Sequence, residues 1–256
     1  MSRSLLFLLL LSHIKFSISL DIYCEYEKED WGYMTIGSIY ECEVASSLSV
    51  TQKDTQIGYV GGYHSWGFGI SNVQGFHVQG KTMHYLPKGI AKFFANLIGL
   101  SVSGCELKEI TQDDLKVFTK LKHAFLIKNE IEVIEADLFK FNPSLIYVNL
   151  NDNQIKEVHP TAFNGLTSLK ALLMNNNKCI DSNADDNDLI NKLIETMKDS
   201  CWVAEITTMS GKASKITEEP LERDFVALST KIGIALGVFV MILIIGVGVM
   251  IYMKKK

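Results

Sequence analysis

The chain has 256 residues, a formal net charge of −4, and 47% hydrophobic and 21% charged residues. This acidic balance leaves no basic patch of the kind that binds nucleic acid, so nucleic-acid-binding proteins are excluded as a class. Once the two apolar ends and a polar stretch near the C-terminus are set aside, about 180 residues remain, enough for one domain with a sizeable core.

Residues 1–19 are typical of a signal peptide. Arg3 precedes an apolar run over 5–11, and the small residues Ser17 and Ser19 favour cleavage near Ser19 or Leu20. A membrane-spanning helix is the alternative, but the run is too short to cross a bilayer. We therefore expect the rest of the chain to enter the secretory pathway, where cysteines pair as disulfides.

Residues 20–69 are expected to form an N-terminal cysteine cap and a lead-in to the repeats that follow. Cys24 and Cys42 flank a segment rich in aromatic residues, among them Trp31 and Tyr40, and predict a hairpin closed by a disulfide. The stretch 51–75 is rich in glycine and aromatic residues. It either belongs to the cap or leads into the repeats, and the sequence leaves both interpretations open.

A pattern of apolar residues recurs every 24 residues, about five times, over residues 70–178. Leu97, Leu121, Leu145 and Leu169 occupy one slot of this pattern, for example. Within each repeat the spacing L-x-x-L-x-L places alternate side chains on one face, which is the period of a strand. A fixed repeat stacks such strands side by side as a parallel sheet, in which each unit buries its apolar face only against its neighbours.

The full spacing, L-x-x-L-x-L-x-x-N-x-L, resembles the signature of the leucine-rich repeat family. The resemblance implies a leucine-rich repeat solenoid, a short α/β horseshoe with parallel strands on its concave face. It also implies that Asn129, Asn153 and Asn177 form a ladder that bonds buried backbone groups where the chain leaves each strand. Cys105 occupies that column in one repeat, as the family permits. Lys81 occupies it in the first, which departs from the pattern and predicts an irregular or edge-like repeat.

A second column is expected to fill the convex side of the same solenoid. Phe94, Phe118 and Leu166 recur at the 24-residue period, with Asn142 as the exception. The resemblance implies that these side chains pack beneath the sheet.

Residues 179–203 are expected to cap the other end of the array. Cys179 and Cys201 bracket a helical stripe of apolar side chains over 185–198 and predict a second disulfide. Acidic residues at 181, 185, 186 and 188 either bind calcium or favour the start of this helix, and the lack of a calcium-loop spacing favours the helix start. Cys105 is then left over, and we expect a buried, inert thiol rather than a reactive one.

The C-terminal part predicts a membrane tether. A polar stalk over 204–231 precedes an uncharged stretch over 232–253, long enough to span a bilayer, and three lysines over 254–256 favour a cytoplasmic end. A glycolipid-anchor signal is the alternative, although such a tail normally ends without charges. Gly233 and Gly237 form a G-x-x-x-G, which either mediates contact with another helix or reflects the abundance of glycine in membrane helices.

The outward positions of the central strands carry apolar and aromatic side chains where solubility alone would require polar ones. Such clusters mark partner sites, and aromatic anchors dominate interface energetics. We therefore predict a ligand-binding concave face; the alternative is that a flanking loop, such as 51–69, folds over it. The predicted site residues are His123, Phe125, Ile127, Tyr147, Asn149 and Leu173.

The sequence offers no motif for catalysis. It has no nucleophile elbow, phosphate loop or local cysteine and histidine spacing for zinc, so we expect no enzyme activity, no cofactor and no metal. The cysteine caps, short array and single span resemble insect-type leucine-rich repeat surface proteins. This organisation implies a single-pass type I protein at the cell surface that binds a protein partner through its concave face. The alternative is an accessory subunit that associates through residues 232–253 with a channel or receptor and modulates it.

Overall fold

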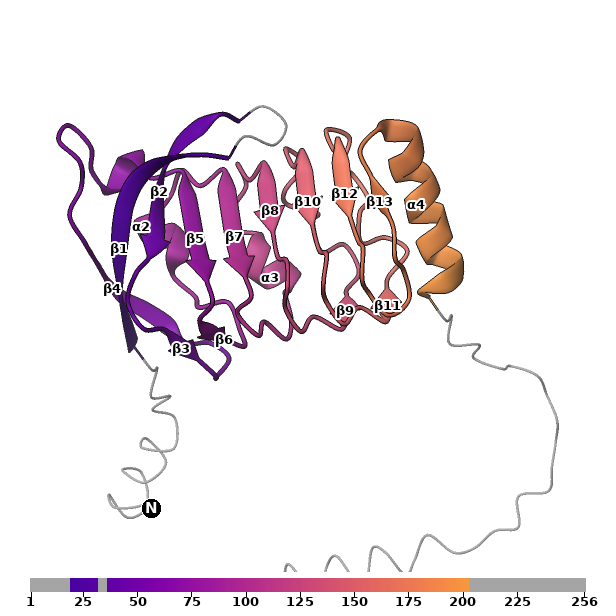
Figure 1. Cartoon of the computed structure of the whole chain (residues 1–256), viewed down its shortest axis with the longest axis horizontal. Coiled ribbons are helices and arrows are strands. Elements are labelled where there is room, and N and C mark those ends of the chain that lie inside the picture. The colour runs from indigo at the N-terminus through magenta and orange to yellow at the C-terminus, as the bar shows by residue number, and fades with distance from the viewer. Residues whose placement is uncertain (1–18, 32–35, 203–256) are drawn as a thin grey trace, which may run out of the picture. The chain divides into compact units, whose positions relative to one another are not determined.

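Five parallel strands, one from each predicted repeat, form the centre of a nine-stranded sheet (Figure 1). The computed structural model describes residues 19–31 and 36–202. Neighbouring strands pair at the 24-residue register: Phe76 lies beside Leu100, and Ala124 lies between Leu100 and Val148. All four side chains are buried, so the predicted solenoid core is confirmed. The five strands are β5 (Gly75–Gln79), β7 (Gly99–Ser103), β8 (His123–Phe125), β10 (Tyr147–Asn149) and β12 (Ala171–Leu173).

The predicted asparagine ladder is present where the chain leaves these strands. Asn153 donates from Nδ2 to the carbonyls of Leu126, Leu150 and Asn151 at 2.8, 3.0 and 3.2 Å, and its Oδ1 accepts from the amide of Ile131. Asn129 and Asn177 make equivalent bonds to their own neighbours. The ladder therefore joins each repeat to the one before it through buried backbone groups.

Cys105 fills the ladder position of its repeat as a buried free thiol. Its Sγ donates to the carbonyl of Val78, 27 residues earlier, at 3.5 Å. Asn129 donates to the carbonyl of Val102 across the same 27-residue step, at 2.8 Å. Burial raises the pKa of the Cys105 thiol, which keeps it protonated and able to donate. The cysteine thus makes a weaker version of the same contact.

The first repeat is regular despite Lys81. Strand β5 pairs with β7 along its whole length, from Gly75 beside Gly99 to Gln79 beside Ser103. Val78 and Met83 are fully buried, while Lys81 is partly exposed. The prediction of an irregular or edge-like repeat is therefore wrong, because neighbouring strands on both sides hold this one in place.

The N-terminal cap continues the sheet beyond the repeats. A hairpin of β1 (Ser19–Asp30) and β2 (Ser38–Val44) is closed by the predicted disulfide between Cys24 and Cys42. Strand β2 pairs with β5, and β4 (Gln56–Gly61) pairs with β1 to form the sheet edge. Strand β3 (Ser49–Val50) pairs with β6 (Thr82–Met83) away from the main sheet. Residues 51–61 thus belong to the cap.

The C-terminal cap is a strand and a helix held by the second predicted disulfide, between Cys179 and Cys201. Strand β13 (Asn183–Ala184) pairs antiparallel with β12, and helix α4 (Asn187–Ser200) covers the end of the array. Ile190, Leu193 and Met197 form its buried face. Asp186 is the N-cap, and its Oδ1 accepts from the amide of Leu189 at 2.8 Å, which supports the helix-start interpretation of the acidic cluster.

The side opposite the sheet is built of short elements. Phe94, Phe118 and Asn142 are buried there, and Asn142 donates from Nδ2 to the carbonyls of Leu115 and Phe118. The exception in the phenylalanine column is therefore a hydrogen-bonded residue. The elements are η1 (Ile70–Asn72), α2 (Ile90–Phe93), α3 (Gln112–Leu115) and the pair β9 (Val133–Ile134) and β11 (Glu157–Val158).

The predicted signal peptide, stalk and membrane span lie outside the described residues, apart from Ser19. Within 19–31 and 36–202, no helix has both the length and the apolar character needed to cross a membrane.

Replacing the central ladder residue tests its contribution to stability. We expect Asn153→Ala to lower the free energy of unfolding by about 3 kcal/mol, because buried carbonyls and an amide lose their partner. Urea denaturation of the purified chain measures this change. Asn191→Ala, on the exposed side of α4, is the control and should change stability by less than about 0.5 kcal/mol. Equal losses in the two variants would contradict a special role for the ladder.

Candidate protein-binding face

The register places outward side chains in rows across the sheet face that points away from the core, here called the outer face. One row runs from β2 to β12 through Glu41, Gly75, Gly99, His123, Tyr147 and Ala171. The next row runs through Glu43, His77, Ser101, Phe125, Asn149 and Leu173. This is the concave face of the predicted horseshoe, and all the predicted site residues except Ile127 lie in these two rows.

Two glycines leave space in the first row, and the cap hairpin fills it. A Cβ atom on Gly99 would lie 2.5 Å from Cζ3 of Trp31, and one on Gly75 would lie 2.7 Å from Cβ of Glu41. Real side-chain atoms do not approach so closely. The two glycines are therefore required by the close approach of Trp31 and Glu41 to the sheet.

Trp31 begins a cluster of rings over the middle of the outer face. Its ring meets Phe125 edge to face at 5.4 Å, and Phe125 lies 5.1 Å from Tyr147. His123 lies 5.7 Å from Phe125 and 5.6 Å from Tyr147. Such aromatic pairs contribute beyond the apolar area that they bury. Through Trp31, the cap hairpin therefore packs against the second and third repeats.

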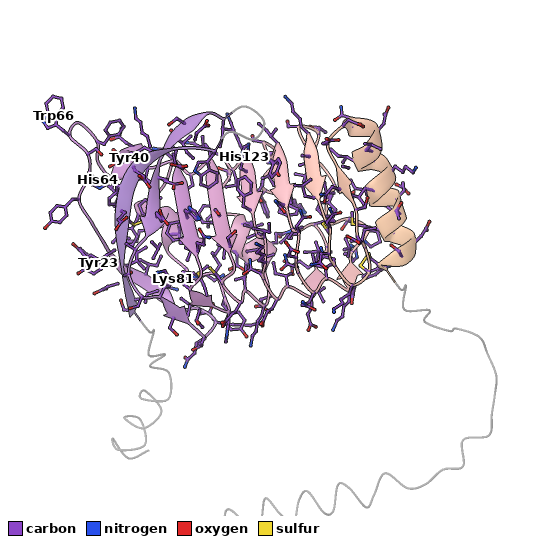
Figure 2. The ribbon with its side chains drawn as sticks, in the orientation of Figure 1. Tyr23, Tyr40, His64, Trp66, Lys81 and His123 are labelled. Atoms are coloured by element: carbon purple, nitrogen blue, oxygen red, sulfur yellow. A yellow bond between two sulfur atoms is a disulfide. The ribbon has the colours of Figure 1, made fainter. Side chains whose placement is uncertain are left out.

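His123 is fully buried in this cluster (Figure 2), and neither of its ring nitrogens has a hydrogen-bond partner among the described residues. Burial, and to a smaller extent the charge of Lys122, lowers the pKa of His123 to about 4. The imidazole is therefore neutral at physiological pH and packs as an aromatic ring.

The predicted site residues divide into two groups. Phe125, Ile127 and Leu173 are partly exposed, as a binding role requires, whereas the other three are buried: His123, Tyr147 and Asn149. The last three occupy outward positions in the register, as predicted, but their side chains are covered. His123 and Tyr147 pack against each other and against Phe125, and Asn149 Oδ1 accepts from the amide of Asn151. Their role in ligand binding stays a prediction.

The alternative prediction was that a flanking loop, such as 51–69, covers the apolar patch. Part of the patch is covered, but by a different segment. Trp31 of the hairpin lies on Phe125, whereas residues 51–69 pack at the end of the sheet. There His64 stacks on Tyr26 at 3.9 Å and its Nδ1 lies 3.0 Å from the hydroxyl of Tyr40. Tyr63 and Trp66, in the same loop, are 97% and 99% exposed. Figure 2 shows Trp66 pointing away from the sheet.

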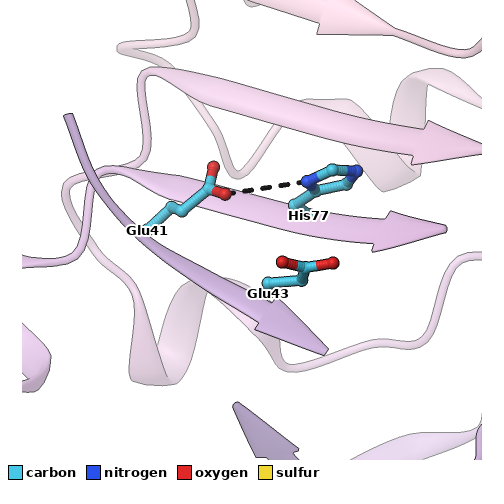
Figure 3. Close-up of side chains that lie close together, drawn as sticks. All are labelled: Glu41, Glu43 and His77. Carbon is cyan, nitrogen blue, oxygen red and sulfur yellow. Dashed lines mark ion pairs between the residues drawn. The ribbon is translucent and has the colours of Figure 1, made fainter. Parts of the chain in front are cut away.

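A buried carboxylate lies beside Trp31. Glu41 is only 1% exposed, and its Oε2 accepts from Trp31 Nε1 at 2.5 Å. Its Oε1 lies 3.6 Å from Nδ1 of His77 (Figure 3). Interaction with Glu41 raises the pKa of His77, and the charges of Glu43 and Glu29 act in the same direction. This end of the outer face is therefore acidic and contains a histidine that the acids favour in its charged form.

The family comparison adds to this geometry. A leucine rich repeat family model matches residues 119–178, which include β8, β10 and β12 and all three ladder asparagines. This part of the chain is therefore similar to leucine-rich repeats. The match to the leucine-rich repeat model begins after the two repeats in which Lys81 and Cys105 replace the asparagine. A comparison with curated proteins finds no match.

Sequence reasoning missed the contribution of Trp31 and Glu41 to this face. Both lie in the cap, where the 24-residue period does not apply: Cys42 pairs with Phe76, 34 residues later. The pair of glycines at 75 and 99, one period apart and both in outward positions, is the signal that marks the place where another segment packs.

Filling the space at Gly99 tests the packing of Trp31. We expect Gly99→Leu to displace the indole, lower the free energy of unfolding by about 1–3 kcal/mol and shift Trp31 fluorescence toward that of an exposed tryptophan. The measurement uses a Trp66→Phe/Trp202→Phe background, which leaves Trp31 as the only indole of the chain. Gly69→Ala is the control, because a Cβ there meets no atom within 4 Å. An unchanged spectrum in Gly99→Leu would show that Trp31 does not lie on this glycine.

The pH dependence of stability tests the burial of His123. Its pKa is lowered from 6.5 to about 4 in the folded chain, so the folded state binds fewer protons than the unfolded state between these values. The contribution of neutral His123 to the free energy of unfolding is therefore fully present above pH 6.5. It falls by up to about 3 kcal/mol as the pH approaches 4. The difference between the parent chain and His123→Phe, measured by urea denaturation across this range, isolates the effect. Parallel pH profiles would contradict it.

Proposed function

We propose that this protein is a membrane-tethered extracellular recognition module that binds a protein partner through the outer face of its sheet. Leucine-rich repeat domains generally mediate protein–protein interaction. The observation that carries the proposal is the partial exposure of Phe125, Ile127 and Leu173 at outward positions that the repeat core does not use.

The arrangement of these three residues suits a binding surface. Phe125 and Leu173 lie in one row, with Asn149 between them, and Ile127 lies two residues beyond Phe125. Polar side chains at Asn151 and Asn175 border them and are partly exposed. An apolar centre with a polar border is the common anatomy of a protein interface.

The face is also rigid before any partner arrives. The ladder fixes the backbone on one side of the strands, and Trp31 packs against Phe125 on the outer side. A surface held in its binding geometry loses little conformational entropy on association. A partner therefore gains most of the free energy of burying these side chains.

The proposal of a membrane tether is supported by the sequence at the two ends of the chain. The apolar run near the N-terminus supports export, and the uncharged stretch over 232–253, followed by three lysines, supports a single span with the repeats outside the cell. A binding role rather than a catalytic one is part of the same proposal.

Proximity labelling on intact cells tests location and binding together. We compare the full chain with the double variant Ile127→Asp/Leu173→Asp, which places charge on the outer face while avoiding the buried Tyr147 and His123. The expected result is cell-surface labelling in which a defined set of neighbours drops at least tenfold for the double variant. Far-ultraviolet circular dichroism and surface expression establish that the variant is folded.

The control variant is Tyr63→Ser/Trp66→Ser, which alters the exposed aromatic loop and leaves the outer face intact; it should retain the same neighbours. Loss of neighbours in this variant alone would overturn the use of the outer face.

Loss of neighbours only when Gly233 and Gly237 are changed to leucine would instead support the accessory subunit that associates through its membrane helix.

A further inference from the structure

Three metal-binding side chains converge at the N-terminal end of the outer face. Glu41 and Glu43 come from β2 and His77 from the adjacent strand β5, where Glu43 and His77 are direct partners in the register. One ligand atom from each of the three lies within 4.8 Å of the others (Figure 3). We propose that Glu41, Glu43 and His77 form a zinc-binding site.

The spacing of Glu41 and His77 fits a bridging metal better than a direct bond. Oε1 of Glu41 lies 3.6 Å from Nδ1 of His77, which is too long for a hydrogen bond. Two ligands of a tetrahedral zinc ion, each about 2.0 Å from the metal, are about 3.3 Å apart. A zinc ion therefore fits between these two atoms with a small adjustment, and the partly exposed Glu43 can rotate to supply the third ligand.

The charges around the site favour a bound cation. Glu25 and Glu27 of β1 pair with Glu43 and Glu41 in the register and share their face. Among the described residues, His77 is the only basic side chain paired with Glu41 or Glu43, because the ion pairs of the lysines involve other acids. A carboxylate as buried as Glu41 is costly unless a positive charge balances it; protonated His77 supplies this charge in the metal-free chain, and a zinc ion would replace that proton on binding.

Trp31 holds Glu41 in the orientation that the site requires. Its Nε1 donates to Oε2 of Glu41 at 2.5 Å, which leaves Oε1 directed toward His77. Hydrogen bonds of this kind from outside the ligand set orient metal-binding carboxylates and strengthen the site. Trp31 is itself fixed by Gly99 and Phe125, so the orientation is built into the fold.

The ligand set selects zinc over calcium. Calcium requires six to eight oxygen ligands, whereas zinc binds imidazole nitrogen together with carboxylate oxygen in four-coordinate sites. Three protein ligands leave a fourth position of the tetrahedron for water or for a side chain of a partner. Because His77 is partly exposed and the site opens onto the outer face, this position is accessible from solvent.

Zinc titration of the purified, tag-free full chain in detergent tests the proposal. After chelator treatment, zinc chloride is added at pH 7.5 in competition with a chromophoric chelator. We expect one zinc ion per chain, and at least tenfold weaker binding in His77→Gln and in Glu43→Gln. Both side chains are partly exposed, so these variants should fold. The matched control is His84→Gln, which removes a second histidine–glutamate pair, with Glu106, that lacks a third ligand; its affinity should equal that of the parent chain.

Two further readouts separate a defined site from a diffuse acidic surface. Zinc should change the fluorescence of Trp31 in a Trp66→Phe/Trp202→Phe background, because the indole donates a hydrogen bond to a ligand. Calcium in tenfold excess should not displace the metal. Zinc binding that is unchanged in His77→Gln and Glu43→Gln would overturn the proposal. So would the absence of binding at 1 mM zinc, or displacement by calcium.

Discussion

The whole sheet depends on how buried backbone groups are satisfied where the chain leaves each strand. A solenoid turns inward once per repeat, and each turn removes carbonyl and amide groups from water. Side-chain amides satisfy these groups: Nδ2 of Asn129, Asn153 and Asn177 each donates to a backbone carbonyl of the preceding repeat. Since the five repeat strands are only three to five residues long, their own hydrogen bonds alone would hold them weakly, and the ladder helps to fix the register of β7, β8, β10 and β12.

This constraint explains which parts of the fold the sequence predicts. A residue that must bond the preceding repeat recurs at a fixed spacing, so the strands, the ladder and the buried Cys105 are all readable from the period. The caps are readable in outline, because cysteine pairs and an amphipathic stripe mark their limits. The regular packing of the first repeat was not predictable from Lys81 alone, since its strand is held by β2 and β7 rather than by its own ladder residue.

The outer face was predicted less well, for a physical reason. Its residues are set by what packs on them, and the segment that packs there comes from a hairpin outside the period. Trp31 reaches Gly99 and Phe125 across about 70 to 90 positions of sequence. Periodicity therefore identifies Phe125 as an outward residue but gives no information on whether another part of the chain covers it. Likewise, rules for zinc motifs rely on short spacings, whereas Glu41 and His77 are neighbours only through the sheet register.

Trp31 links the two functions that we propose for this face. The same indole donates to Glu41 on one side and meets Phe125 on the other, above the space left by Gly99. The orientation of Glu41 and the packing on Phe125 therefore depend on the same side chain. Among the described residues, Trp31 of the cap therefore connects the acidic end of the face with its apolar middle.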